Sequence, residues 1–132
     1  MTVSSYRELL VWQRAMDLVV ECYRLTDGFP RTEIYGLSSQ LRRAAVSVPS
    51  NTAEGAGRTH TREFIRHLGI ARGSLFEAET QILISERLDY AAAGVTSPLL
   101  SAVAEVGRML HGLITSLERK LETSESERSK HG

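Results

Sequence analysis

The amino-acid sequence predicts an all-α protein, an antiparallel up-down-up-down four-helix bundle whose second helix is kinked at Pro49. Four segments place apolar residues three and four positions apart, which is the spacing of one helix face. No segment sustains the apolar and polar alternation of a strand, and aromatic residues make up only 6% of the chain. A length of 132 residues suits one domain without internal repeats.

The first helix is expected over residues 5–26. A second apolar row lies beside its apolar stripe, so this helix should bury more than one face. The stripe is Leu9, Trp12, Met16, Val19 and Tyr23, and the flanking row is Val11, Ala15, Leu18, Cys22 and Leu25. Gly28 and Pro30 then end the helix.

The second helix is expected over residues 32–56, with Thr32 as its N-cap. Pro49 removes a backbone donor and crowds the carbonyl of Ala45, so the helix must bend or restart there. Because apolar residues resume at Ala53 or Ala56, a bent but continuous helix is favoured over a loop. The apolar stripe is Ile34, Leu37, Leu41, Ala44 and Val48.

Polar residues surround Pro49 and predict a structural polar network of Ser47, Ser50, Asn51 and Glu54. The first three can supply hydrogen bonds to backbone groups freed by the proline, and Glu54 shares their helical face. If that face meets the third helix, Glu54 needs a partner, because an unpaired buried carboxylate is costly. Arg58 or Arg62 is within reach.

The third helix is expected over residues 60–88, and its stripe is the most regular in the chain. Gly69 and Gly73 lie one turn apart within it, and each weakens the helix by about 1 kcal/mol relative to alanine. Their presence indicates that a neighbouring backbone packs close by; tolerated surface glycines are the alternative. The stripe is Phe64, Leu68, Ala71, Leu75, Ala78, Ile82 and Ser85.

The fourth helix is expected over residues 97–121, because Ser97 can cap it and Pro98 suits the first helical position. The bundle would then occupy residues 1–121, and the polar tail 122–132 should be disordered. The stripe of this helix is Leu99, Val103, Val106, Leu110, Leu113 and Leu117.

The composition bounds the compartment and the chemistry. One cysteine, Cys22, fits a reducing compartment and a core position, and charged residues interrupt the N-terminal stretch before a signal peptide or membrane span could form. A cytoplasmic protein without membrane contact is expected. A Glu-x-x-His pair, as in di-iron bundles, does not occur, and the Gly55–Arg58 run lacks the spacing and Lys-Ser/Thr of a phosphate loop. We therefore expect no catalytic, cofactor-binding or metal-binding residues, no cofactor and no enzymatic activity.

The remaining chemistry is a set of arginines. Net charge is zero, yet residues 31–72 hold seven arginines against three glutamates. Helical spacing would place three of these arginines on one ridge, which could bind phosphates with salt-sensitive affinity. A solvated face, or pairing with acids of the same bundle or of neighbouring subunits, is the alternative. The tentative nucleic-acid-binding residues are Arg42, Arg43, Arg58, Arg62 and Arg66.

Several motifs together resemble one known family. They are LLVWQRAMDL (9–18), GLSSQLRRAAVSVPSNTAEGAGR (36–58), EFIRHLGIARGSLFEAETQ (63–81) and the closing leucine-rich helix. The sequence resembles the bacterial four-helix-bundle proteins encoded by intervening sequences in 23S ribosomal RNA genes, although Thr52 stands where isoleucine is common. The resemblance implies a ring-like homopentamer, and a similarity to accessory proteins of diversity-generating retroelements, which associate with a reverse transcriptase and bind nucleic acid.

Two hypotheses of function follow. The first is a non-enzymatic oligomeric bundle that binds RNA, or an RNA-associated protein, through the basic surface of the five arginines. The alternative is a protein-interaction scaffold without nucleic-acid binding, in which the same arginines pair with acidic residues.

Overall fold

A computed structural model describes residues 5–131, which form four α-helices and two short 3-10 helices. No strand occurs in this range. The elements are η1 (Tyr6–Glu8), α1 (Leu10–Asp27), η2 (Arg31–Glu33), α2 (Leu37–Ala56), α3 (Thr61–Arg87) and α4 (Ala93–His131). The predicted all-α fold is confirmed.

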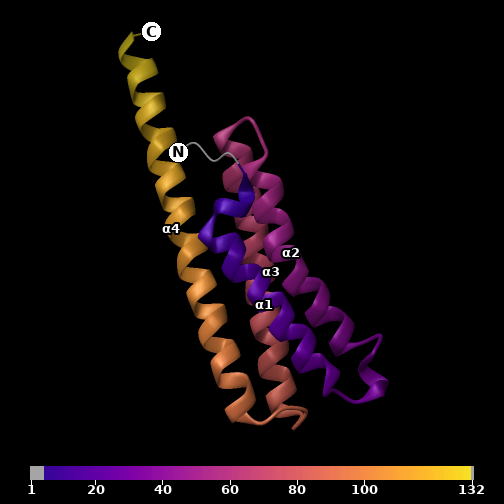
Figure 1. The fold of residues 1–132 in the computed structure, drawn as a ribbon. Coiled ribbons are helices and arrows are strands. Elements are labelled where there is room, and N and C mark those ends of the chain that lie inside the picture. The colour runs from indigo at the N-terminus through magenta and orange to yellow at the C-terminus, as the bar shows by residue number, and fades with distance from the viewer. Residues whose placement is uncertain (1–4, 132) are drawn as a thin grey trace.

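The helices lie side by side, and the chain reverses direction between successive helices (Figure 1). α2 packs between α1 and α3, and α4 closes the bundle against α3 and α1. In the described range the backbones of α1 and α3 do not approach each other closely, so these two helices lie diagonally opposite in the bundle. The core draws on all four helices, with fully buried side chains that include Leu18, Leu41, Leu68, Leu75, Ile82 and Leu110. The packing is that of a four-helix bundle.

The apolar stripes of α3 and α4 are confirmed, whereas the expectation that α1 buries both of its apolar rows is met for one row only. The flanking row from Val11 to Leu25 is buried, while Met16 and Tyr23 of the supposed main stripe are 42% and 41% exposed. Both rows have the same spacing, so periodicity could not decide between them. The outer row instead leaves apolar side chains on the surface of α1.

The connection before α2 differs from the prediction. Thr32 lies within η2, and α2 begins at Leu37 after Gly36. The cap comes from Glu33, whose Oε1 accepts a hydrogen bond of 3.1 Å from the backbone N–H of Leu37. Ile34 therefore lies before the helix and is exposed, not part of the core stripe.

The start of α4 is also earlier than predicted. The helix begins at Ala93 and includes Pro98, so Ser97 is not its N-cap. Thr96 anchors the first turns, because its buried hydroxyl donates to Glu86 Oε1 of α3 at 2.6 Å. Pro98 lacks the N–H that would bond to the carbonyl of Gly94 and its ring crowds that carbonyl, yet the helix continues through it.

The tail was expected to be disordered from residue 122, but α4 continues to His131. Its upper end projects past the α2–α3 turn in Figure 1. Glutamate, arginine and lysine are good helix formers, and Glu125 forms an ion pair with Arg62 of α3. The hydrophobic pattern alone predicted an end at residue 121, whereas helix propensity and charge pairing extend the helix further.

The glycine of close helix packing is Gly55, not Gly69 or Gly73. A Cβ at Gly69 or Gly73 would meet nothing within 4 Å, so the predicted close neighbour is absent from the described chain. A Cβ at Gly55 would lie 2.8 Å from Cβ of His67 and 3.2 Å from the carbonyl oxygen of Phe64. Gly55 therefore permits the close approach of α2 and α3.

α2 is continuous through Pro49, in agreement with the expectation of a helix there and not a loop. The bend at this proline stays a prediction. In the range 5–131 no helix is long and apolar enough to cross a membrane.

Candidate nucleic-acid interface

Two of the four predicted network residues, Ser47 and Asn51, form a polar bridge between α2 and α3. Asn51 Nδ2 donates to the hydroxyl and the carbonyl of Ser47 at 2.9 and 3.0 Å, and Ser74 Oγ donates to Ser47 Oγ at 2.8 Å. Asn51 Oδ1 lies 3.2 Å from Nδ1 of His67. Since an amide oxygen only accepts, His67 Nδ1 is the donor. The bridge holds the two helices in register.

His67 and Ser74 were missed by the sequence reasoning. They lie seven residues apart on α3, which places them on one face, and both point at the Ser47 and Asn51 pair of α2. The sequence shows that His67 and Ser74 are seven residues apart, but it does not show which neighbouring helix they face. His67 Nε2 is buried without a hydrogen-bond partner among the described residues.

Ser50 and Glu54 do not belong to this bridge. Ser50 is exposed on the outside of α2 and joins none of the hydrogen bonds described above. Glu54 is also exposed, and its Oε1 accepts from Arg58 at 2.7 Å. The expected pair of Glu54 and Arg58 is confirmed, although it closes the end of α2 and does not join α2 to α3.

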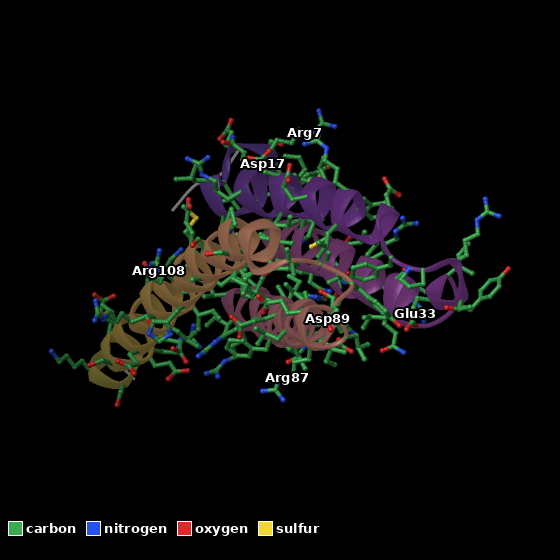
Figure 2. The ribbon with its side chains drawn as sticks, turned by 90° about the horizontal axis from the view of Figure 1, so that it is seen from below. Arg7, Asp17, Glu33, Arg87, Asp89 and Arg108 are labelled. Carbon is green, nitrogen blue, oxygen red and sulfur yellow. The ribbon has the colours of Figure 1, made fainter. Side chains whose placement is uncertain are left out.

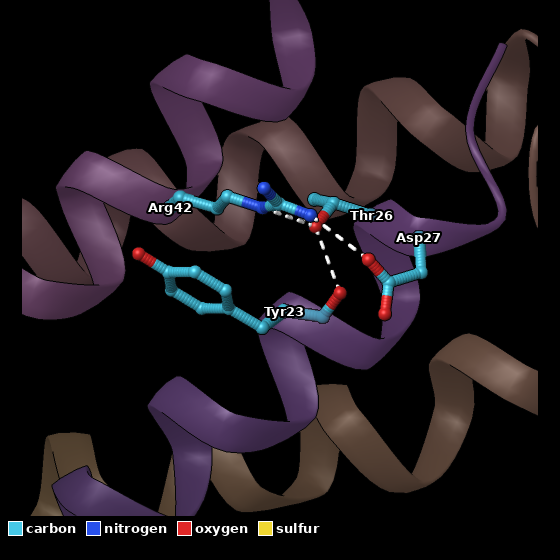
Figure 3. A network of polar contacts seen from close by, with 4 residues as sticks. All are labelled: Tyr23, Thr26, Asp27 and Arg42. Atoms are coloured by element: carbon cyan, nitrogen blue, oxygen red, sulfur yellow. Dashed lines mark hydrogen bonds and ion pairs between the residues drawn. The ribbon is translucent and has the colours of Figure 1, made fainter. Parts of the chain in front are cut away.

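Arg42 joins α2 to the end of α1. Its Nε donates to Thr26 Oγ1 at 2.7 Å, and its terminal nitrogen lies 3.0 Å from Oδ1 of Asp27 (Figure 3). The guanidinium also lies 4.7 Å from the ring centroid of Tyr23. Three contacts with one neighbouring helix make Arg42 a clamp in the bundle, so it is not available to a ligand.

Arg43 is the next residue along α2 but points outward. The contact described for it is a weak one, 3.4 Å to Ser39 Oγ. It lies beside Tyr23, Ile34 and Val46 on a shallow groove between the outer faces of α1 and α2. Nearly four turns of α2, roughly 20 Å, lie between Arg43 and the end of that helix, just before Arg58. The five predicted arginines therefore do not form one patch.

Arg58, Arg62 and Arg66 do lie together, from the α2–α3 turn into the first turns of α3, and we call these three residues the arginine ridge. All three are exposed. Arg58 pairs with Glu54 and Arg62 pairs with Glu125, whereas no partner within residues 5–131 is described for Arg66.

A groove of about 380 Å³ separates the ridge from α4. Arg62, Ile65 and Arg66 line one wall, and the other wall is Glu118, Leu121, Glu122 and Glu125. These glutamates were missed because their segment was expected to be the end of the bundle and a disordered tail. Two of the five predicted arginines, Arg62 and Arg66, thus face an acidic stretch of α4.

The far end of the bundle carries a second polar contact, between the two connections at that end. Tyr90 O–H donates to Glu33 Oε2 at 2.7 Å, and Figure 2, viewed from this end, labels Glu33 and Asp89 in the two connections. The bond from Tyr90, with the one from the Leu37 N–H, lowers the pKa of Glu33, and the same bond raises the pKa of Tyr90. The bond stabilises the fold above the unfolded carboxyl pKa and below the unfolded phenol pKa.

Cys22 is buried, and its burial raises the pKa of the thiol to about 12. The side chain acts as a small core residue. Within residues 5–131, His, Cys, Asp and Glu side chains do not gather in a group of three or more that could hold a metal ion.

The comparisons with known proteins agree with the fold. A family model described as 23S rRNA-intervening sequence protein matches residues 7–112. The chain is similar to a crystal structure from Bacteroides thetaiotaomicron, described as a protein of unknown function from the S23 ribosomal protein family. The TM-score is 0.75 at 20% identity, covering 80% of this chain and 98% of that one. Comparison with curated proteins gave no match. The chain belongs to the family of 23S rRNA-intervening sequence proteins.

Proposed function

We propose that this protein is a non-enzymatic bundle that assembles with copies of itself and binds RNA through the arginine ridge. The observation that carries the RNA proposal is the placement of Arg58, Arg62 and Arg66 together at one end of the bundle, all exposed. Two guanidinium groups one turn apart on α3, with a third in the connection before it, suit the phosphates of a nucleic-acid backbone.

The ion pairs of the ridge are compatible with this proposal. The side chains of Arg58 and Glu54 are 45% and 51% exposed, and those of Arg62 and Glu125 are 70% and 49% exposed. Ion pairs this open contribute only about 0–1 kcal/mol. A phosphate oxygen can replace the carboxylate with little loss.

Self-assembly is supported by apolar side chains on the two diagonal helices. Met16, Val20 and Tyr23 are exposed on α1, and α3 exposes another apolar set: Ile70, Phe76, Leu83 and Ile84. Because these two faces lie on different sides of the bundle, a contact between them would be heterologous, which closes into a ring when the rotation permits. This geometry suits the homopentamer that the family resemblance implies.

The RNA proposal is tested by fluorescence anisotropy with a labelled RNA hairpin at about 50 and 200 mM salt. Each lost phosphate contact removes about 0.7–0.9 from the salt slope, so three contacts account for a roughly 20- to 40-fold change in affinity over that range. We expect Arg58→Gln/Arg62→Gln/Arg66→Gln to lose this salt dependence. The control is Arg24→Gln/Arg87→Gln/Arg108→Gln, with the same charge change elsewhere. Equal behaviour of both triple variants, or no salt-sensitive binding by the native protein, would sink the proposal.

The scaffold without RNA binding is the second candidate, and the pairing of Arg42, Arg58 and Arg62 with acids of the same chain favours it. It predicts that Glu54→Gln weakens the assembly or the fold and that no RNA binds. Light scattering after size exclusion measures the assembly. Replacing Phe76 with Asp on the outer face of α3 should dissociate the oligomer, and an unchanged mass would exclude this face as the contact.

A further inference from the structure

The last part of α4 adds little to the hydrophobic core. The family model ends at residue 112, but α4 continues to His131. Leu117 is buried, and from residue 118 to residue 130 Leu121 alone is half-buried while every other residue is exposed. We call residues 118–131 the α4 extension. A helix that buries so little apolar surface is held mainly by its charges.

The charges of the α4 extension are sorted by face. Glu118, Glu122 and Glu125 are spaced four and three residues apart, so they share one face, and all three line the groove opposite Arg62 and Arg66. The other acidic residue of the extension, Glu127, is two positions from Glu125 and lies about half a turn around the helix.

Basic residues of the α4 extension lie mostly elsewhere. By helical spacing Arg119, Lys120 and Lys130 fall away from the acidic face. Arg128 is different, since it lines a neighbouring hollow of about 350 Å³ together with His60, Arg62 and Glu125. The face turned to the arginine ridge is therefore predominantly acidic, and the ion pair of Arg62 with Glu125 is the direct contact across it.

We propose that the α4 extension is an intramolecular competitor of RNA: its acidic face covers Arg62 and Arg66 of the arginine ridge and must be displaced before a phosphate backbone can bind there. This inference rests on the proposed RNA binding. A row of carboxylates three and four residues apart presents the ridge with the charge that a phosphate backbone would present. The contact can open because its ion pair is exposed and little apolar surface is buried with it.

The test compares two single-charge variants of the full chain, Glu125→Gln and Glu127→Gln. Both remove one negative charge from the same helix, but of these two residues only Glu125 faces the ridge. The apparent affinity for RNA is proportional to the fraction of chains in which the ridge is open, and loss of the Glu125 charge raises that fraction. Glu125→Gln should therefore tighten binding of the RNA hairpin by about two- to fivefold. Glu127→Gln should change it less than about twofold. Equal effects of the two variants would overturn the competition, since bulk charge would then explain both.

A distance measurement supplies an independent readout. Spin labels at Gly69→Cys and Ser126→Cys, in a Cys22→Ala background, report the separation of α3 and the α4 extension. Both positions are exposed, and a side chain at Gly69 has open space. RNA should lengthen this distance in the native charge background, and an unchanged distance at saturating RNA would contradict displacement.

The two proposals fail in different ways. If native and Glu125→Gln proteins bind RNA equally well, with α4 in place, the competition fails and RNA binding stands. We expect the triple variant Glu118→Gln/Glu122→Gln/Glu125→Gln to bind RNA more tightly, on the order of tenfold. If neither this variant nor any other binds RNA, the proposal of RNA binding fails and the proposed competition fails with it. Circular dichroism confirms that each variant keeps its helices.

Discussion

One substitution, glycine to alanine, should have opposite effects at two places in this bundle. At Gly55 the new Cβ would lie 2.8 Å from Cβ of His67 and 3.2 Å from the backbone oxygen of Phe64. At Gly69 it would meet nothing within 4 Å. Alanine raises helix propensity by about 1 kcal/mol at both positions, so packing alone decides the sign of the difference.

The magnitudes follow from these distances. The carbonyl of Phe64 belongs to the backbone of α3 and cannot rotate away as a side chain can, so α2 and α3 must separate. Overpacking of this kind costs about 1–3 kcal/mol, and after the gain in propensity Gly55→Ala should lose up to about 2 kcal/mol of unfolding free energy. Gly69→Ala should gain up to about 1 kcal/mol. Because the propensity gain cancels, the variants then differ by the packing cost, about 1–3 kcal/mol.

Urea unfolding followed by circular dichroism measures this difference. With an m-value of about 2 kcal/mol/M, the two midpoints should be separated by about 0.5–1.5 M. Equal midpoints, or a more stable Gly55→Ala, would refute the assignment of Gly55 as the contact glycine. A loss of stability in Gly69→Ala that grows with protein concentration would instead place a second chain against the outer face of α3.

Two further predictions concern the polar contacts. Arg42→Met keeps the apolar stem but loses the bonds to Thr26 and Asp27, so it should cost about 1 kcal/mol in urea unfolding, while the exposed neighbour Arg43→Met should stay within about 0.5 kcal/mol of the native protein. No difference between these two variants would remove the clamp role of Arg42. Tyr90→Phe should lower the thermal midpoint between roughly pH 5 and 9 and converge with the native protein below and above that range, because the lost bond exists only between an ionised Glu33 and a protonated phenol. A difference that does not change with pH would contradict this origin.

Local patterns identified most of the fold, and the errors have a common cause. The rows of α3 and α4 were found because each helix has one apolar face, whereas α1 has two rows of equal spacing and the neighbours decide which row is buried. The cap from Glu33 and the anchor from Thr96 were missed because both act across a turn that patterning did not resolve. The α4 extension was missed because a helix without an apolar face gives no periodic signal.

The candidate site was harder to predict because it depends on what faces each side chain. Helical spacing predicted one ridge of Arg58, Arg62 and Arg66, but Arg58 lies in the connection before α3. Spacing also could not separate Arg42, which the end of α1 neutralises, from Arg43, which points outward. Contacts with the end of α1, which lies 15 or 16 residues away in the chain, pair Arg42 but not Arg43. The five arginines, which the sequence suggested as one basic surface, are therefore separated by their tertiary contacts.

The segment around Pro49 is better explained by packing than by binding. Three of its residues act between α2 and α3: Ser47 and Asn51 bridge to α3, and Gly55 allows the two helices to approach. The outward residues of the same segment, Ser50 and Glu54, are exposed, and only Glu54 reaches the arginine ridge, through Arg58. A ligand would therefore meet this segment at its end and not at its centre. The proposed phosphate-binding chemistry lies where the ridge meets α4, so the charge of Glu125, and not the proline, is the informative position to change.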